Sequence, residues 1–111
     1  MENMKALYIT VNAGFSEEIV DIARAAGAGG ATIMNARGEG FKQQTIMGIT
    51  VDSEKEIVLC VVEKNVAIKI MDAVKEKAGI GTPAHGVCYF TPVERATKTV
   101  ANSNKIDDTL L

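Results

Sequence analysis

The chain has 111 residues and a formal net charge of −2, and 47% of its residues are hydrophobic and 23% charged. This length suits one globular domain, and so weak a charge provides no field that would hold nucleic acid or an anionic membrane. Because no apolar run approaches the ~20 residues of a membrane-spanning helix and the start lacks a secretory pattern, we expect a cytoplasmic protein without direct membrane insertion.

The first part of the chain predicts a strand, a helix and a second strand. Residues 5–11 and 31–36 are β-rich apolar runs, typical of strands. Between them, apolar residues recur at helical spacing over 17–26. We expect Ser16 to supply the N-cap oxygen of this helix and Gly27 to end it in the left-handed conformation.

The pattern breaks between residues 38 and 55, where polar and apolar residues mix. We interpret this interval as a projecting loop, and the sequence Asp-Ser-Glu-Lys at 52–55 as the turn of a hairpin within it. A long loop that carries apolar residues is typical of a docking element. The candidate docking residues are Phe41, Lys42, Ile46, Met47 and Ile49.

The remaining part predicts a strand, a helix and a last strand. Residues 57–62, Ile-Val-Leu-Cys-Val-Val, form the strongest strand signal of the chain. Asn65 is expected to cap a second helix that Gly79 ends, and a glycine-rich loop then leads into a strand at 87–91. The polar residues 101–111 are expected to form a flexible C-terminal tail.

This order of elements predicts an α+β domain over residues 1–100, the ferredoxin-like βαββαβ sandwich with an antiparallel sheet and both helices on one face. A sheet covered on one face should alternate apolar and polar residues, but residues 57–62 are apolar throughout. Large apolar side chains stabilise by ~1.5–3 kcal/mol each when buried. We therefore infer that further copies of the chain cover the second face, as a closed homo-oligomer.

The junctions between these elements carry a family resemblance. Residues 27–32 (GAGGAT), 37–40 (RGEG), 81–86 and 90–94 (FTPVE), in this order and spacing, resemble the nitrogen regulatory protein P-II family over about residues 5–100. The resemblance implies a homotrimeric signal-transduction protein of nitrogen regulation. It implies an adenine nucleotide (ADP, AMP or ATP) bound in the clefts between subunits as effector, with no obligatory cofactor. The implied partner is a regulated enzyme or a membrane transporter that the projecting loop contacts.

The resemblance also implies a set of nucleotide-binding residues. In the family, the matching positions contact the adenine, line its pocket, form the base of the projecting loop, cradle the phosphates or reach in from the neighbouring subunit. These residues are Thr32, Gly38, Glu39, Gly40, Val61, Ala84, His85, Gly86, Val87 and Lys98. Val87 stands where the family has a lysine that grips phosphate, and the projecting loop has no tyrosine that could be uridylylated. An ADP, AMP or other adenosine ligand therefore fits better than ATP-driven control of glutamine synthetase.

Two other functions remain open. One is a ligand-free trimeric interaction module or metal-tolerance-type trimer, although a metal site needs clustered ligands. Cys60 and Cys88 lie in apolar strands and are interpreted as buried thiols. The other function is a small enzyme, but no serine, cysteine or carboxylate has a spacing that pairs with His85, the single histidine. We expect no catalytic and no metal-binding residues.

Overall fold

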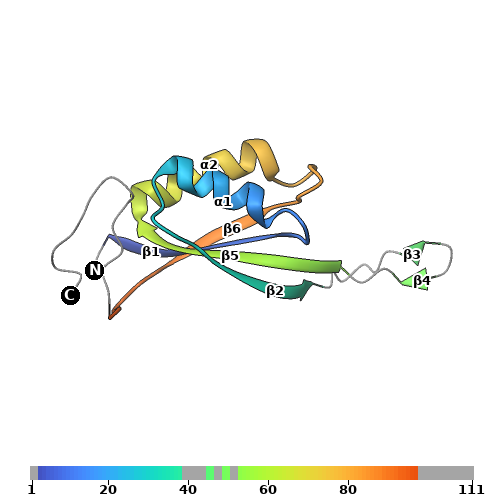
Figure 1. Ribbon diagram of the computed structural model, residues 1–111, viewed down its shortest axis with the longest axis horizontal. Coiled ribbons are helices and arrows are strands. Elements are labelled where there is room, and N and C mark those ends of the chain that lie inside the picture. The colour runs from blue at the N-terminus through green and yellow to red at the C-terminus, as the bar shows by residue number, and fades with distance from the viewer. Residues whose placement is uncertain (1–2, 39–44, 47–48, 51–52, 98–111) are drawn as a thin grey trace.

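The computed structural model describes residues 3–38, 45–46, 49–50 and 53–97. Figure 1 shows two helices packed on one face of a twisted sheet, with a small ribbon of two short strands projecting from one end. In chain order the elements are β1 (Met4–Asn12), α1 (Ser16–Ala26), β2 (Thr32–Gly38), β3 (Thr45–Ile46), β4 (Ile49–Thr50), β5 (Ser53–Glu63), α2 (Lys64–Ala78) and β6 (Val87–Pro92).

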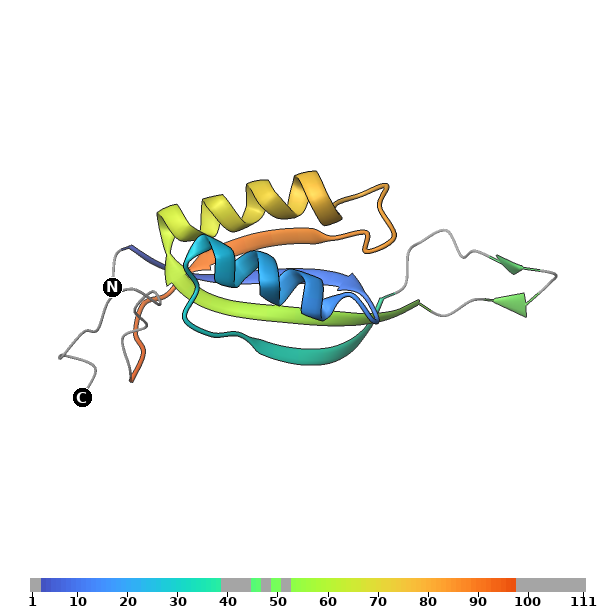
Figure 2. The ribbon, with the colours of Figure 1, turned by 45° about the horizontal axis from the view of Figure 1, so that its top comes forward.

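The main sheet is antiparallel and has the strand order β2-β5-β1-β6. The strands β1 and β5 occupy its centre and pair along the full length of β1, from Met4 opposite Glu63 to Asn12 opposite Lys55. Figure 2 shows α1 and α2 side by side on the same face of this sheet. The predicted ferredoxin-like α+β arrangement is confirmed.

The core lies between this face and the two helices. Alternate residues of the central strands point into it, and the helices contribute residues at 3.6-residue spacing. The fully buried side chains include Leu7, Ile9, Val11, Val58 and Cys60 from the sheet, and Ile19, Ile70 and Val74 from the helices.

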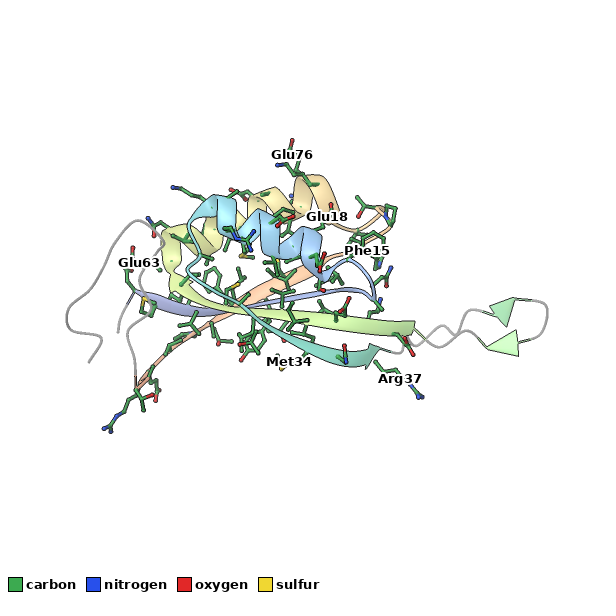
Figure 3. All side chains as sticks on the ribbon, in the orientation of Figure 1. Phe15, Glu18, Met34, Arg37, Glu63 and Glu76 are labelled. Carbon is green, nitrogen blue, oxygen red and sulfur yellow. The ribbon has the colours of Figure 1, made fainter. Side chains whose placement is uncertain are left out.

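The opposite face of the sheet, which we call the open face, is also apolar. The intervening residues of β5, Ile57, Leu59 and Val61, are half-buried in the single chain. Tyr89 is 54% exposed and Met34 is 37% exposed, and Figure 3 shows Met34 on the side of the sheet away from the helices. The prediction that β5 is apolar on both faces is confirmed. That further copies of the chain cover the open face stays a prediction.

The helix boundaries confirm the two predicted stops and correct the two predicted N-caps. α2 ends at Ala78, and Gly79 follows it directly. Gly27 has a φ of 112° and ends α1; its N–H donates to the carbonyl of Arg24 at 3.1 Å while that of Ala28 donates to the carbonyl of Ala23 at 3.0 Å, a Schellman motif. Ser16 was the wrong N-cap, because Phe15 occupies that position and Ser16 is the first helical residue.

Asn65 is likewise not the cap of α2. β5 runs directly into the helix, so Glu63 holds the N-cap position and Asn65 is the second helical residue. Its side chain still binds a backbone group in the first turn of α2, because Oδ1 of Asn65 accepts a hydrogen bond from the N–H of Val66 at 3.0 Å.

The predicted turn at 52–55 is wrong for its described residues. Ser53, Glu54 and Lys55 extend β5, where they pair with Gly38, Arg37 and Ala36 of β2. The hairpin of the projecting segment lies earlier, because Thr45 pairs with Thr50 and Ile46 with Ile49. The paired strands β2 and β5 therefore carry the ribbon of β3 and β4 at one end of the sheet. Residues 39–52, which connect β2 to β5, are called the projecting segment below.

Candidate functional site

The glycine-rich turn between α2 and β6 is held by hydrogen bonds within itself. The N–H and the hydroxyl of Thr82 both donate to the carbonyl of Gly79, at 3.1 and 2.7 Å. The N–H of His85 donates to the carbonyl of Thr82 at 3.0 Å. His85 adopts a φ of 50°, which is uncommon for a residue other than glycine. The turn therefore presents an exposed imidazole on a defined backbone.

Gly86 fastens the end of this turn to α2. Its N–H donates to the carbonyl of Ala78 at 2.6 Å. A Cβ at this position would lie 2.5 Å from that carbonyl oxygen and 3.2 Å from Cγ1 of Val74. Only glycine allows so close an approach, so packing against α2 explains why this position is a glycine.

Asn12, the last residue of β1, joins the turn to the base of the projecting segment. Its N–H donates to the carbonyl of Ala84 at 2.8 Å, and its Nδ2 donates to the carbonyl of Pro83 at 2.9 Å. Its Oδ1 accepts a hydrogen bond from Nζ of Lys55 at 2.6 Å. The roles of Asn12 and Lys55 could not be predicted from the sequence, because their partners lie far away in the chain and no local pattern marks them.

Lys55 in turn lies against the end of β2. A Cβ on Gly38 would lie 3.3 Å from both Cγ and Cε of Lys55, so the lysine side chain covers Gly38 closely. Gly38 and Ser53 are the last paired residues before the projecting segment. The glycine-rich turn and the base of this segment thus lie at the same end of the sheet.

A carboxylate stabilises the neighbouring turn between β1 and α1. Oε1 of Glu56 accepts a hydrogen bond from the N–H of Gly14 at 2.6 Å, and Oε2 accepts one from the hydroxyl of Ser16 at 3.1 Å. A hollow of about 610 Å³ beside this turn is lined by residues of β2 and β5, Arg37 and Lys55 among them. It forms a concave surface at the base of the projecting segment.

The predicted nucleotide-binding residues fall into two groups in the single chain. Gly38 and the run 84–87 lie at the end of the sheet from which the segment projects. Thr32, opposite Leu59, and Val61 lie further along β2 and β5. Ile46 and Ile49 are backbone partners in the ribbon formed by β3 and β4. The other predicted residues, Glu39, Gly40, Phe41, Lys42, Met47 and Lys98, lie outside the described residues.

The two thiols are free, Cys60 buried and Cys88 half-buried. Burial raises the pKa of both thiols, because desolvation disfavours the thiolate. Within the described ranges, no group of three or more His, Cys, Asp or Glu residues is placed to hold a metal ion. The helices that the structure describes include none long and apolar enough to cross a membrane.

Comparison with known proteins gives one family and a set of similar folds. The model of the nitrogen regulatory protein P-II family matches residues 4–102. A PII-like signalling protein from Thermus thermophilus is 23% identical, with a TM-score of 0.62, and the match covers 79% of this chain and 84% of that one. No curated protein matches the chain.

Two solved structures of B. subtilis GlnK are similar as well. The GlnK–ATP complex is 18% identical, with a TM-score of 0.65 and coverage of 85% of this chain and 86% of that one. A second GlnK structure is 16% identical, with a TM-score of 0.63 and coverage of 83% and 86%. At these identities the structural likeness establishes the fold.

Proposed function

The chain belongs to the nitrogen regulatory protein P-II family, and from this we propose that it is a cytoplasmic homotrimer that binds an adenine nucleotide and reports it to a partner protein. The signal-transduction role follows from the family. The nucleotide, the trimer and the partner are the proposed parts. We propose no catalytic role for any of its residues.

The observation that carries the proposal is the position of the glycine-rich turn. The run 84–86 and Gly38 lie at the same end of the sheet, next to its two opposite edge strands, and Asn12 and Lys55 on the central strands connect them. A ligand held at this turn would therefore be linked to the base of the segment through Asn12 and Lys55. Binding that favours one arrangement of the segment would shift its population, typically by about 1–3 kcal/mol of coupling.

The open face of the sheet supports the trimer. Ile57, Leu59 and Val61 are half-buried without a covering layer, and Tyr89 is more than half exposed. Apolar patches of this kind on a single chain favour association. Closed assembly of identical chains would remove them from water and form clefts between subunits.

In such a cleft, we assign Thr32 and Val61 to the adenine and the run 84–86 to the phosphates, with Val87 in the place of the family's lysine. The backbone of Gly38, Glu39 and Gly40 would lie against the nucleotide, and Lys98 would reach in from a neighbouring subunit. ADP, AMP and ATP are the candidate effectors, and B. subtilis GlnK, a protein of the same fold, has been solved in complex with ATP. The projecting segment, through Phe41, Lys42, Ile46, Met47 and Ile49, would then bind a regulated enzyme or a membrane transporter.

Calorimetric titration of the purified protein with ADP, AMP and ATP tests this proposal. We expect saturable heat with at least one nucleotide and a change in the proteolysis rate of residues 39–52 when it is bound. Lys98→Ala should weaken binding by about 10-fold or more, since a hydrogen bond to a charged group contributes roughly 1.5–3 kcal/mol, whereas Lys69→Ala, an exposed lysine of α2, should not. Absence of heat with all three nucleotides would remove the proposal.

A further inference from the structure

We propose that the side chain of Asn12 couples the glycine-rich turn to the base of the projecting segment, so that a displacement at Pro83 is transmitted to Lys55 and Gly38. The two ends of one planar amide make this link. Nδ2 donates to the carbonyl of Pro83 at 2.9 Å, and Oδ1 accepts from the ammonium of Lys55 at 2.6 Å. Because nitrogen and oxygen belong to one rigid group, a rotation that follows Pro83 also moves the acceptor of Lys55.

The turn is built to move as a unit. Thr82 bonds twice to the carbonyl of Gly79, and His85 bonds back to Thr82. Gly86 packs so tightly on Ala78 that no side chain fits there. A force applied to the exposed part of the turn is therefore not absorbed within it, and the carbonyls of Pro83 and Ala84 carry the displacement to Asn12.

At the other end of the link, Lys55 packs against Gly38 at the base of the projecting segment. Lys55 lies on β5 opposite Ala36, and its methylene groups cover Gly38, where a Cβ would be only 3.3 Å away. Gly38 has no side chain that could shield its backbone from a change in Lys55. When the ammonium loses its acceptor on Asn12, the contact with Gly38 loosens at the residue that precedes the projecting segment.

This link gives the proposed function a route from ligand to segment, and its physiological meaning rests on that function. The link itself exists in the unliganded chain, so it can be tested without any nucleotide. Thr82→Val removes the hydroxyl bond to Gly79 and perturbs the turn. The amide chemical shifts of Lys55 and Gly38, measured by NMR on the full chain, report its far end.

The perturbation is measured in three backgrounds. In the wild-type background, Thr82→Val should shift the amides of Lys55 and Gly38. In Asn12→Asp, which keeps an acceptor for Lys55 but cannot donate to Pro83, the same shifts should fall by about threefold or more, as expected when two groups are coupled through a third. In Asn35→Ala, which removes an exposed asparagine three residues before Gly38, they should stay at the wild-type size.

Asn12→Ala provides a second variant that removes both bonds and should lower the shifts to the same extent. Undiminished shifts in Asn12→Asp and Asn12→Ala would overturn the proposal, as would no response of Lys55 and Gly38 in the wild-type background. A nucleotide titration separates the two proposals. If no nucleotide binds, the proposed function fails while the ligand-free result still decides the role of Asn12.

Discussion

Tyr8 of β1 and Tyr89 of β6 stack on the open face of the sheet, with ring centroids 5.3 Å apart and ring planes inclined by 19°. The two residues are direct partners in the ladder between these strands. An aromatic pair of this geometry contributes about 0.5–1.5 kcal/mol beyond its buried area. The stack thus gives the open face a rigid aromatic centre beside Leu59, which pairs with Tyr8 from the other side.

A charge on this face should prevent assembly of the chain. Leu59→Asp would place an unpaired carboxylate in the proposed interface. An uncompensated buried charge costs roughly 3–5 kcal/mol. We expect sedimentation velocity to show a trimer for the wild type and a monomer for Leu59→Asp. Ile68→Asp places the same charge on α2, where the side chain is already 43% exposed, and should remain trimeric. A Leu59→Asp protein that sediments like the wild type would contradict the proposed interface.

Gly86→Ala should destabilise the fold. The new Cβ would lie 2.5 Å from the carbonyl oxygen of Ala78, a backbone atom that cannot move aside, and overpacking of this kind costs about 1–3 kcal/mol. Chemical denaturation at a fixed protomer concentration measures this loss. Gly30→Ala is the matched control, because a Cβ there meets no atom within 4 Å. Equal stability of the two variants would show that Gly86 is not required by packing.

Glu56→Ala should destabilise the start of α1. It removes the acceptor of the Gly14 N–H and of the Ser16 hydroxyl, and the loss should be roughly 1.5 kcal/mol in the free energy of unfolding. Glu56→Gln keeps an acceptor and should lose less. The control is Glu76→Ala on the outer surface of α2, labelled in Figure 3, which should change stability by no more than about 0.5 kcal/mol.

We expect the thiols of Cys60, which is buried, and Cys88, which is half-buried, to lower the stability of the protein at alkaline pH. Burial raises the folded-state pKa of Cys60 and Cys88 above the ordinary value of 9.0. Between the unfolded and folded pKa values the folded chain binds more protons than the unfolded chain, so the free energy of unfolding falls as the pH rises. The stability that the two protonated thiols contribute is fully present below pH 9.0. It is lost as the pH rises through the folded-state pKa.

The double variant Cys60→Ala, Cys88→Ala isolates this effect. As the pH rises above 9.0, its melting temperature should fall less steeply than that of the wild type. The two proteins differ only at these two positions, so the comparison removes the contribution of every other group. Parallel pH profiles would show that the thiols do not contribute to the alkaline instability.

Much of the fold could be predicted because its signals are local. The left-handed stop at Gly27 and the strand at 57–62 depend on residues that are close together in the sequence. Ser16 and the turn at 52–55 were wrong because distant partners decide them. Ser16 bonds to Glu56, 40 residues away, and Lys55 continues β5 because β2 pairs with it. Polar residues are typical of a turn, but they are also accepted at the end of a strand such as β5, which pairs with the edge strand β2.

The candidate site was predictable only in part for the same reason. The glycines within residues 79–86 predicted a turn there, because they are close together in the sequence. The residues that tie this turn to the rest of the chain were not visible, because Asn12 reaches Lys55 across 43 residues and Pro83 across 71. Such contacts arise from sheet topology and leave no periodic pattern.

The last rung between β2 and β5, Gly38 opposite Ser53, fixes both ends of the intervening segment at the spacing of a strand pair. The entropy of closing a loop rises by only about 0.6 kcal/mol each time its length doubles. Insertions and deletions between these two residues would therefore leave the domain almost as stable as before. The intervening segment can thus change in length and sequence while the sheet that carries it keeps its shape.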